Sequence, residues 1–152
     1  MIVICDASVI IVLAKLGFLT LLRDLFGSVL IPRSVYAESI VKAVESEMVA
    51  ITLAIDAGWL RVMPDPDEVP AGPGRGERAS LALASSLNAD LVIVDDLAAR
   101  RSAIAAGFLV TGTVGVLRRA IDSDLISGGE PLISALVEAG FRATDDLFHQ
   151  LG

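Results

Sequence analysis

The sequence predicts an α/β fold in which the central sheet is mostly parallel. Short apolar runs of strand length alternate along the chain with longer segments of helical spacing, a pattern typical of this class. The runs at residues 2–5 and 91–94 contain no polar side chain, as expected for strands that are covered on both faces. Acidic residues follow both runs directly, at Asp6 and at Asp95-Asp96. Ligand sites in open parallel sheets lie beyond the carboxyl ends of the strands, so the fold class also predicts where chemistry would be concentrated.

The first half of the chain contains three predicted strands and the helices between them. Residues 9–16 and 18–26 have helical character, and a glycine follows each segment, as at the ends of many helices. Pro32 follows the second strand, where a helix can begin because the missing N–H of proline costs nothing in a first turn. One long helix is then predicted over residues 34–57, with Gly58 as its stop. The predicted strands of this half are residues 2–5, 29–31 and 59–62.

The second half of the chain continues the alternation after a loop. Residues 63–75 are rich in proline and glycine, which predicts a loop and the most mobile part of the chain. A helix opens at Gly76-Glu77. Strands are predicted at residues 89–94 and 108–110, and helices at residues 97–106, 131–139 and 144–151 and from the cap at residues 111–113 through residue 120.

Length and composition limit the class of protein. A chain of 152 residues fits one compact domain. Its mean hydropathy of +0.70 is high, but no stretch reaches the roughly 20 uncharged apolar residues of a membrane span. No secretory signal is evident, which predicts a cytoplasmic protein with no membrane association. The single Cys5 excludes an internal disulfide and a cysteine-rich zinc site.

Charge and apolar content bear on the partners. The net charge of −7 argues against broad electrostatic attraction to nucleic acid, although an acidic cleft filled with cations can still hold a phosphate backbone. The apolar excess predicts that some helix surface is buried against a second chain, as in a homodimer. Sedimentation that shows only monomer at high concentration would contradict this expectation.

The acidic residues at element ends are predicted to converge. Asp6 and Asp95-Asp96 emerge at the same sheet edge if the first and fourth predicted strands are neighbours. Glu38 lies near the start of the helix after the second strand, and Glu77 at the start of the helix before the fourth. Carboxylates so close together repel one another, and a hard divalent cation relieves that repulsion. An all-oxygen set without histidine or cysteine suits Mg²⁺ or Mn²⁺, which can support the hydrolysis of phosphodiesters.

Each acid also has a purely structural interpretation. Asp6 after a strand is typical of a helix cap, and so is one member of the adjacent aspartate pair. Glu38 can form an exposed ion pair with Lys42, four residues further along a helix. Glu77 in a first helical turn is favoured by the helix macrodipole. Taken one at a time, these interpretations stay open.

The order of these segments resembles a PIN domain, the nuclease fold of many prokaryotic toxin–antitoxin ribonucleases of the VapC type. The resemblance covers roughly residues 1–120, and the tail around residues 140–142 resembles a subgroup described only as predicted nucleic-acid-binding proteins. The matching segments are VICDAS at residues 3–8, IPRSVYAE at 31–38, GERASLALA at 76–84 and LVIVDDLAARRSA at 91–103.

The resemblance implies a fold and an activity. The fold would be a three-layer α/β/α sandwich formed by a single PIN-like domain over residues 1–152, with a core over about 1–120 and a C-terminal helical extension over about 121–152. The activity would be RNA cleavage with Mg²⁺ or Mn²⁺, often by dimers that an antitoxin blocks. The family's acids fall on Asp6, Glu38, Glu77 and Asp96. Asp95 occupies a position that often holds another polar residue, and it is a further candidate metal ligand, with an incidental role as the alternative. Hydroxyls near the metal in the family correspond to Thr111 and Thr113, and helix capping is the favoured role for Thr113.

The leading hypothesis is therefore a divalent-metal-dependent endoribonuclease, with a toxin of a toxin–antitoxin pair as its narrower form. Asp6 and Asp96 would bind the metal directly, and Glu38 and Glu77 would complete the site. A PIN-like module that binds RNA or protein without cutting is the alternative, and a hydrolase of small phosphate esters is a third. The candidates for contact with the RNA backbone are Arg33, Arg75, Arg78, Arg100 and Arg101.

Overall fold

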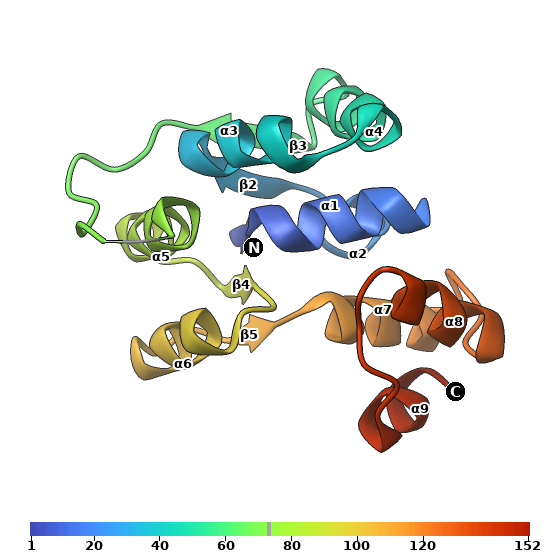
Figure 1. The fold of residues 1–152 in the computed structure, drawn as a ribbon. Helices are drawn as coiled ribbons and strands as arrows, with labels where there is room; N and C mark the ends of the chain where they lie inside the picture. Colours follow the sequence, from blue (N-terminus) through green and yellow to red (C-terminus); the bar gives the residue numbers. More distant parts are fainter. Residues whose placement is uncertain (73) are drawn as a thin grey trace.

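The computed structural model describes residues 1–72 and 74–152; Pro73, within the predicted loop, lies outside the described residues. The described chain alternates between strands and helices, as predicted (Figure 1). The strands are β1 (Val3–Cys5), β2 (Val29–Pro32), β3 (Leu60–Met63), β4 (Leu91–Ile93) and β5 (Val110–Thr111). The helices are α1 (Ala7–Leu16), α2 (Leu21–Phe26), α3 (Arg33–Lys42), α4 (Glu45–Asp56), α5 (Arg75–Leu87), α6 (Leu97–Ala105), α7 (Thr113–Asp122), α8 (Glu130–Glu138) and α9 (Asp145–Leu151).

The sheet has the strand order β3-β2-β1-β4-β5, and each of its strand pairs is parallel. Ile4 in β1 is in register with Leu30 on one side and with Val92 on the other. The chain first builds the sheet outward through β2 and β3, and then returns to the other side of β1 with β4 and β5. The carboxyl ends of β1 and β4 therefore form a topological switch point, the usual place for a ligand crevice in such sheets.

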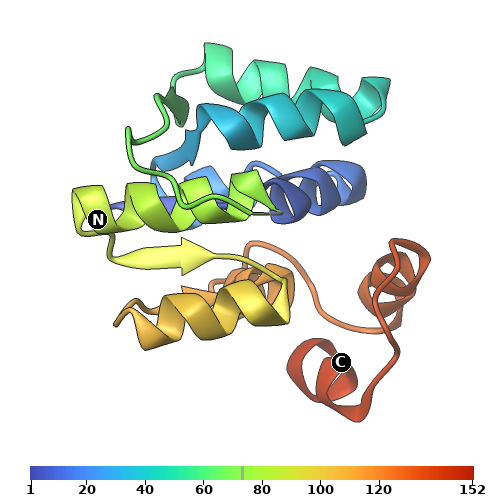
Figure 2. The ribbon, with the colours of Figure 1, turned by 60° about the vertical axis from the view of Figure 1, so that its left-hand side comes forward.

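Side chains that alternate along the strands build two separate hydrophobic cores. Val3 and Cys5 of β1 pack in the larger cluster, with residues of α1, α2, α4 and α7. Ile4 points to the opposite face and packs with Leu83 of α5 and Ala103 of α6. Figure 2 shows α5 and α6 in front of the sheet. The period of two along each strand thus produces the three-layer α/β/α sandwich that the resemblance implied.

One predicted element is wrong. In place of a single helix over residues 34–57, the structure has α3 and α4, separated by extended backbone at Ala43 and Val44. The buried side chain of Glu47 accepts a hydrogen bond from the backbone N–H of Val44 at 3.2 Å, which favours a new helix start at Glu45. The strands predicted at residues 89–94 and 108–110 are also shorter or displaced, at Leu91–Ile93 and Val110–Thr111. The break matters for the site because it ends α3 at Lys42.

Candidate active site

Asp6 is a buried carboxylate at the carboxyl end of the central strand. Its backbone N–H donates to the carbonyl of Ile93 at 3.0 Å, which continues the pairing of β1 with β4. The residue is only 3% exposed, and its Oδ1 has no hydrogen-bond partner among the described residues. Burial raises the pKa of Asp6 to about 6; the backbone N–H of Ala7 opposes the rise, and the charges of Glu77 and Glu38 add to it. A buried oxygen without a partner is costly, so Asp6 is suited to receive a cation.

Glu77 lies in the first turn of α5 and faces the other acids. It is half-buried, and burial, Asp96 and Glu38 together raise its pKa, while Lys42 opposes the rise. Because Glu77 also acts on Asp6, it connects Glu38 of α3, Asp96 before α6 and Asp6 after β1 in one electrostatic cluster. We call Asp6, Glu38, Glu77 and Asp96 the acidic cluster. The pKa effects link Asp6 with Glu38 and Glu77, and Glu77 with Asp96, whereas a single cation site formed by all four stays a prediction.

Gly76 allows α3 and α5 to approach each other at the acidic cluster. It is buried beside Glu38, and a Cβ atom at this position would lie only 2.5 Å from Glu38 Oε2. Any larger residue would therefore displace the carboxylate or separate the two helices. The sequence indicated Gly76 only as the start of a helix. Nothing in the sequence showed that the missing side chain leaves room for the carboxylate of Glu38.

Lys42 supplies a positive charge to the acidic cluster. Its Nζ lies 2.5 Å from Glu38 Oε1, and Glu38, Asp6 and Glu77 each raise the pKa of the lysine. The Glu38–Lys42 ion pair that the purely structural interpretation predicted is therefore present. Glu38 faces the other acids as well. The two interpretations are compatible, because Glu38 pairs with Lys42 and also raises the pKa of Asp6 and of Glu77.

The acidic cluster is not closed around an ion position in this conformation. No group of three or more histidine, cysteine, aspartate or glutamate side chains within residues 1–72 and 74–152 is close enough to form a ready-made metal site. The donor chemistry nevertheless fits Mg²⁺ or Mn²⁺, since the groups are carboxylate oxygens and one of them is buried without a partner. One of these carboxylates, that of Glu38, accepts a hydrogen bond from the ammonium group of Lys42.

The two adjacent aspartates have different surroundings. Asp96 caps α6, and its Oδ2 accepts from the backbone N–H of Ala99 at 2.9 Å. Asp95 is turned toward α7 and accepts from both the backbone N–H and the hydroxyl of Thr113, at 2.8 and 2.6 Å. Thr113 is fully buried and its hydroxyl is bound to Asp95, in keeping with a structural role. Asp95 as a metal ligand stays a prediction that these contacts do not support.

The arginines predicted to contact RNA lie in several different environments. Arg75 forms an ion pair with Asp65 at 3.1 Å, and its Nε donates to Ser34 Oγ at 3.2 Å. Arg78 donates to the carbonyl of Gly72, so both arginines of α5 bind to the loop before it. The remaining three are Arg100, which donates to the carbonyl of Val94 at 3.1 Å, and the exposed Arg33 and Arg101.

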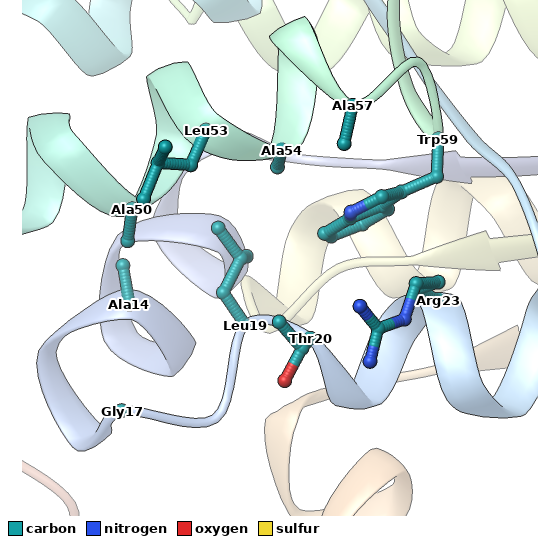
Figure 3. Close-up of a pocket in the computed structure, with 10 residues that line it drawn as sticks. All are labelled: Ala14, Gly17, Leu19, Thr20, Arg23, Ala50, Leu53, Ala54, Ala57 and Trp59. Atoms are coloured by element: carbon teal, nitrogen blue, oxygen red, sulfur yellow. The ribbon is translucent and has the colours of Figure 1, made fainter.

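A separate apolar pocket lies away from the acidic cluster. It has a volume of about 390 Å³ and lies between the α1–α2 region and α4 (Figure 3). Trp59 and Leu53 form part of its wall, and Arg23 is the charged residue that lines it. The pocket lacks the carboxylates that phosphodiester chemistry would need, so its size does not make it the candidate active site.

Comparison with known protein families identifies the family of the chain. A family model described as a PIN domain, DUF3368, matches residues 2–151. No curated protein matched the chain. None of the helices in the described part of the chain is both long and apolar enough to cross a membrane.

Proposed function

Because this chain belongs to the PIN domain family, whose members are generally nucleases that use divalent metals, we propose that it is a Mg²⁺- or Mn²⁺-dependent endoribonuclease. The observation that carries the proposal is the buried, unpartnered Oδ1 of Asp6 within an electrostatic cluster of acids. Under this proposal residues 1–152 form one PIN-like domain, with a core over about 1–120 and a helical extension over about 121–152.

The residues of the acidic cluster have distinct roles in this proposal. Asp6 and Asp96 would hold the metal directly, and Glu38 and Glu77 would complete its surroundings. A bound divalent ion would activate water for attack on the phosphodiester and stabilise the charge that develops on the phosphoryl oxygen. Lys42 balances part of the negative charge before the ion enters, and Arg33 and Arg101 are exposed and available to backbone phosphates.

Cleavage of a mixed RNA pool tests the proposed activity. We expect the protein to produce fragments with Mg²⁺ or Mn²⁺ and none in EDTA. Glu77→Gln should slow cleavage roughly 100-fold, which corresponds to about 2.7 kcal/mol of lost transition-state stabilisation. Glu138→Gln on α8 serves as the matched control, because it removes the same charge at an exposed position and should cut like the wild type.

A binding module that does not cut RNA is the second candidate function. Two observations favour it, namely the ion pair of Lys42 with Glu38 and the absence of a closed metal site within the described residues. RNA binding without any fragment in either metal would support this candidate and contradict the nuclease. Hydrolysis of a small chromogenic phosphodiester alone would instead support a hydrolase of small phosphate esters.

The narrower proposal of a toxin with an antitoxin partner, acting as a homodimer, rests on the resemblance to VapC-type proteins. Exposed apolar side chains on α3 and α4, such as Val41 and Leu53, are consistent with contact to another chain. A small adjacent gene that encodes a DNA-binding motif would support the toxin role, and its absence from the locus would count against it.

Replacing Lys42 with methionine should tighten the binding of Mn²⁺. The ammonium group occupies Glu38 Oε1 and repels an approaching cation, so its removal is expected to lower the dissociation constant about three- to tenfold. Titration of Mn²⁺ followed by electron paramagnetic resonance measures the change directly, without RNA.

Lys15→Met is the control for this titration, because Lys15 and Lys42 are the two lysines of the chain and the same charge is removed. Lys15 lies in the last turn of α1, whereas Asp6 precedes the first turn. If the two substitutions lowered the dissociation constant of Mn²⁺ equally, the change would be a general effect of net charge. That result would contradict competition between Lys42 and the ion for Glu38.

A further inference from the structure

A second pocket, which we call the α9 pocket, is lined by Asp95 but by none of the four residues of the acidic cluster. It has a volume of about 390 Å³ and lies where the ends of β4 and β5 meet α7 and α9. Asp95 lines it, and the next residue in the chain is Asp96 of the acidic cluster. A ligand group bound here would therefore lie beside the proposed cleavage site. The polar groups that line the pocket are those of Asp95, Arg100, Thr111, Asp146 and Gln150.

Hydrogen bonds and two glycines fix the inner wall of the α9 pocket. Thr113 holds both carboxylate oxygens of Asp95, and the carbonyl of Val94 holds Arg100 Nη1. A Cβ atom at Gly112 would collide with Asp95 Oδ1 and would lie 2.7 Å from Arg100 Nη1. At Gly115 a Cβ atom would collide in the same way with the hydroxyl of Thr111. The absence of these side chains leaves the polar groups open to the pocket.

Helix α9 supplies the outer wall. Asp146 and Gln150 are four residues apart, so they lie on the same face of the helix. Leu147 and Leu151 are buried, and Arg118 of α7 donates to the carbonyl of Gln150 at 3.1 Å. Figure 1 shows α9 in dark red at the C-terminal end of the fold. The last helix of the C-terminal extension thus forms one wall of the α9 pocket.

Thr111 adds a hydroxyl to the wall of the α9 pocket. The residue is only 8% exposed, and its hydroxyl lies next to Gly115, which also lines the pocket. The hydroxyl can both donate and accept a hydrogen bond, so it suits a polar ligand. Two carboxylates and one guanidinium line the pocket, so its charge disfavours a phosphate, while donors and acceptors stand side by side.

We propose that the α9 pocket binds an unstacked base of the RNA next to the cleaved phosphate, and that guanine fits it best. Sequence-specific RNA recognition generally uses splayed bases that are hydrogen-bonded along their edges. Guanine offers O6 and N7 to the arginine and N–H groups to a carboxylate, and Arg100 and Asp146 supply those two partners. The base preference of cleavage then depends on α9. The identity of the ligand as RNA rests on the proposed function, but binding of the base does not require cleavage.

Titration of nucleosides tests this site in the full chain without metal. In EDTA we expect guanosine to shift the amide NMR signals of Gly112 and Gly115 at lower concentration than adenosine, cytidine or uridine. Asp146→Asn should weaken guanosine binding about tenfold or more, because a charged acceptor is lost. Asp145→Asn is the matched control, since this neighbouring residue is exposed and does not line the pocket.

Each outcome of the titration decides the proposal. Guanosine-dependent shifts that Asp146→Asn weakens and Asp145→Asn leaves unchanged would support it, even if the protein cut no RNA. Shifts of the same size from all four nucleosides, or from inorganic phosphate, would overturn base recognition. The proposal would also be overturned if no nucleoside shifted these signals, whether or not the protein cuts RNA.

Discussion

Asp6→Asn should abolish RNA cleavage and at the same time make the metal-free protein more stable. Loss of a buried metal ligand removes several kcal/mol of transition-state stabilisation, so we expect a roughly 1000-fold slower reaction or worse. The structural reason is that Oδ1 of Asp6 has no partner in the described chain, which leaves it available to an ion. Cleavage of a mixed RNA pool in Mn²⁺ measures the loss.

The gain in stability distinguishes a missing ligand from a damaged fold. At pH 8 the ionised Asp6 is buried beside other acids, and asparagine removes this unfavourable charge. We expect the free energy of unfolding in EDTA to rise by about 2 kcal/mol, or roughly 4–8 °C in Tm. The control is Asp67→Asn, since Asp67 is exposed in the loop before α5. An Asp6→Asn protein that still cut RNA at the wild-type rate would refute the catalytic assignment.

The stability of the metal-free protein should fall as pH rises from about 4 to 7. Burial and the neighbouring acids raise the pKa of Asp6 from 3.8 to about 6, so the folded state binds this proton more tightly than the unfolded chain. The stabilising contribution is therefore complete below about pH 4 and is lost as pH passes through about 6. A difference of about two pKa units corresponds to about 3 kcal/mol.

Urea unfolding in EDTA between pH 4 and 8 measures this loss. The useful quantity is the difference between wild type and Asp6→Asn, because other groups also titrate: the pKa of Glu77 is raised and that of Asp65 is lowered. Saturating Mn²⁺ should remove the fall, since the ion favours the deprotonated acid. If the difference in the free energy of unfolding between wild type and Asp6→Asn stayed constant across this pH range, the raised pKa of Asp6 would be contradicted.

The sequence carried enough information to predict the parallel sheet and to place two of the acids after neighbouring strands. Residues 2–5 and 91–94 are apolar throughout, as both faces of β1 and β4 require, and each run is followed by aspartate. Once β1 and β4 are neighbours, Asp6 and Asp96 must emerge at one edge. The positions of Asp6 and Asp96 follow from the strand order, and the hydrophobic pattern of the sequence indicates the strands.

Other parts of the site depend on tertiary contacts that no local pattern specifies. The break at Ala43 and Val44 rests on a hydrogen bond to Glu47, in a segment whose composition suits a continuous helix. Asp95 and Asp96 look equivalent in the sequence. Only the packing of α7 brings the hydroxyl of Thr113 to Asp95, where it donates a hydrogen bond. The α9 pocket could not be foreseen either, because Asp146 is 50 residues from Asp96 and reaches this edge through the docking of the last helix.

A crystal structure grown with Mn²⁺ tests the shared cation most directly. We expect the anomalous difference map to show a peak within about 2.2 Å of Asp6 Oδ1 that is also bound by Asp96 or Glu77. Lys42 should then have left Glu38 or share it with the ion. A map with no peak at Asp6, from crystals of protein that cuts RNA in Mn²⁺, would contradict the proposed site, and so would a peak held only by Asp95 and Asp146.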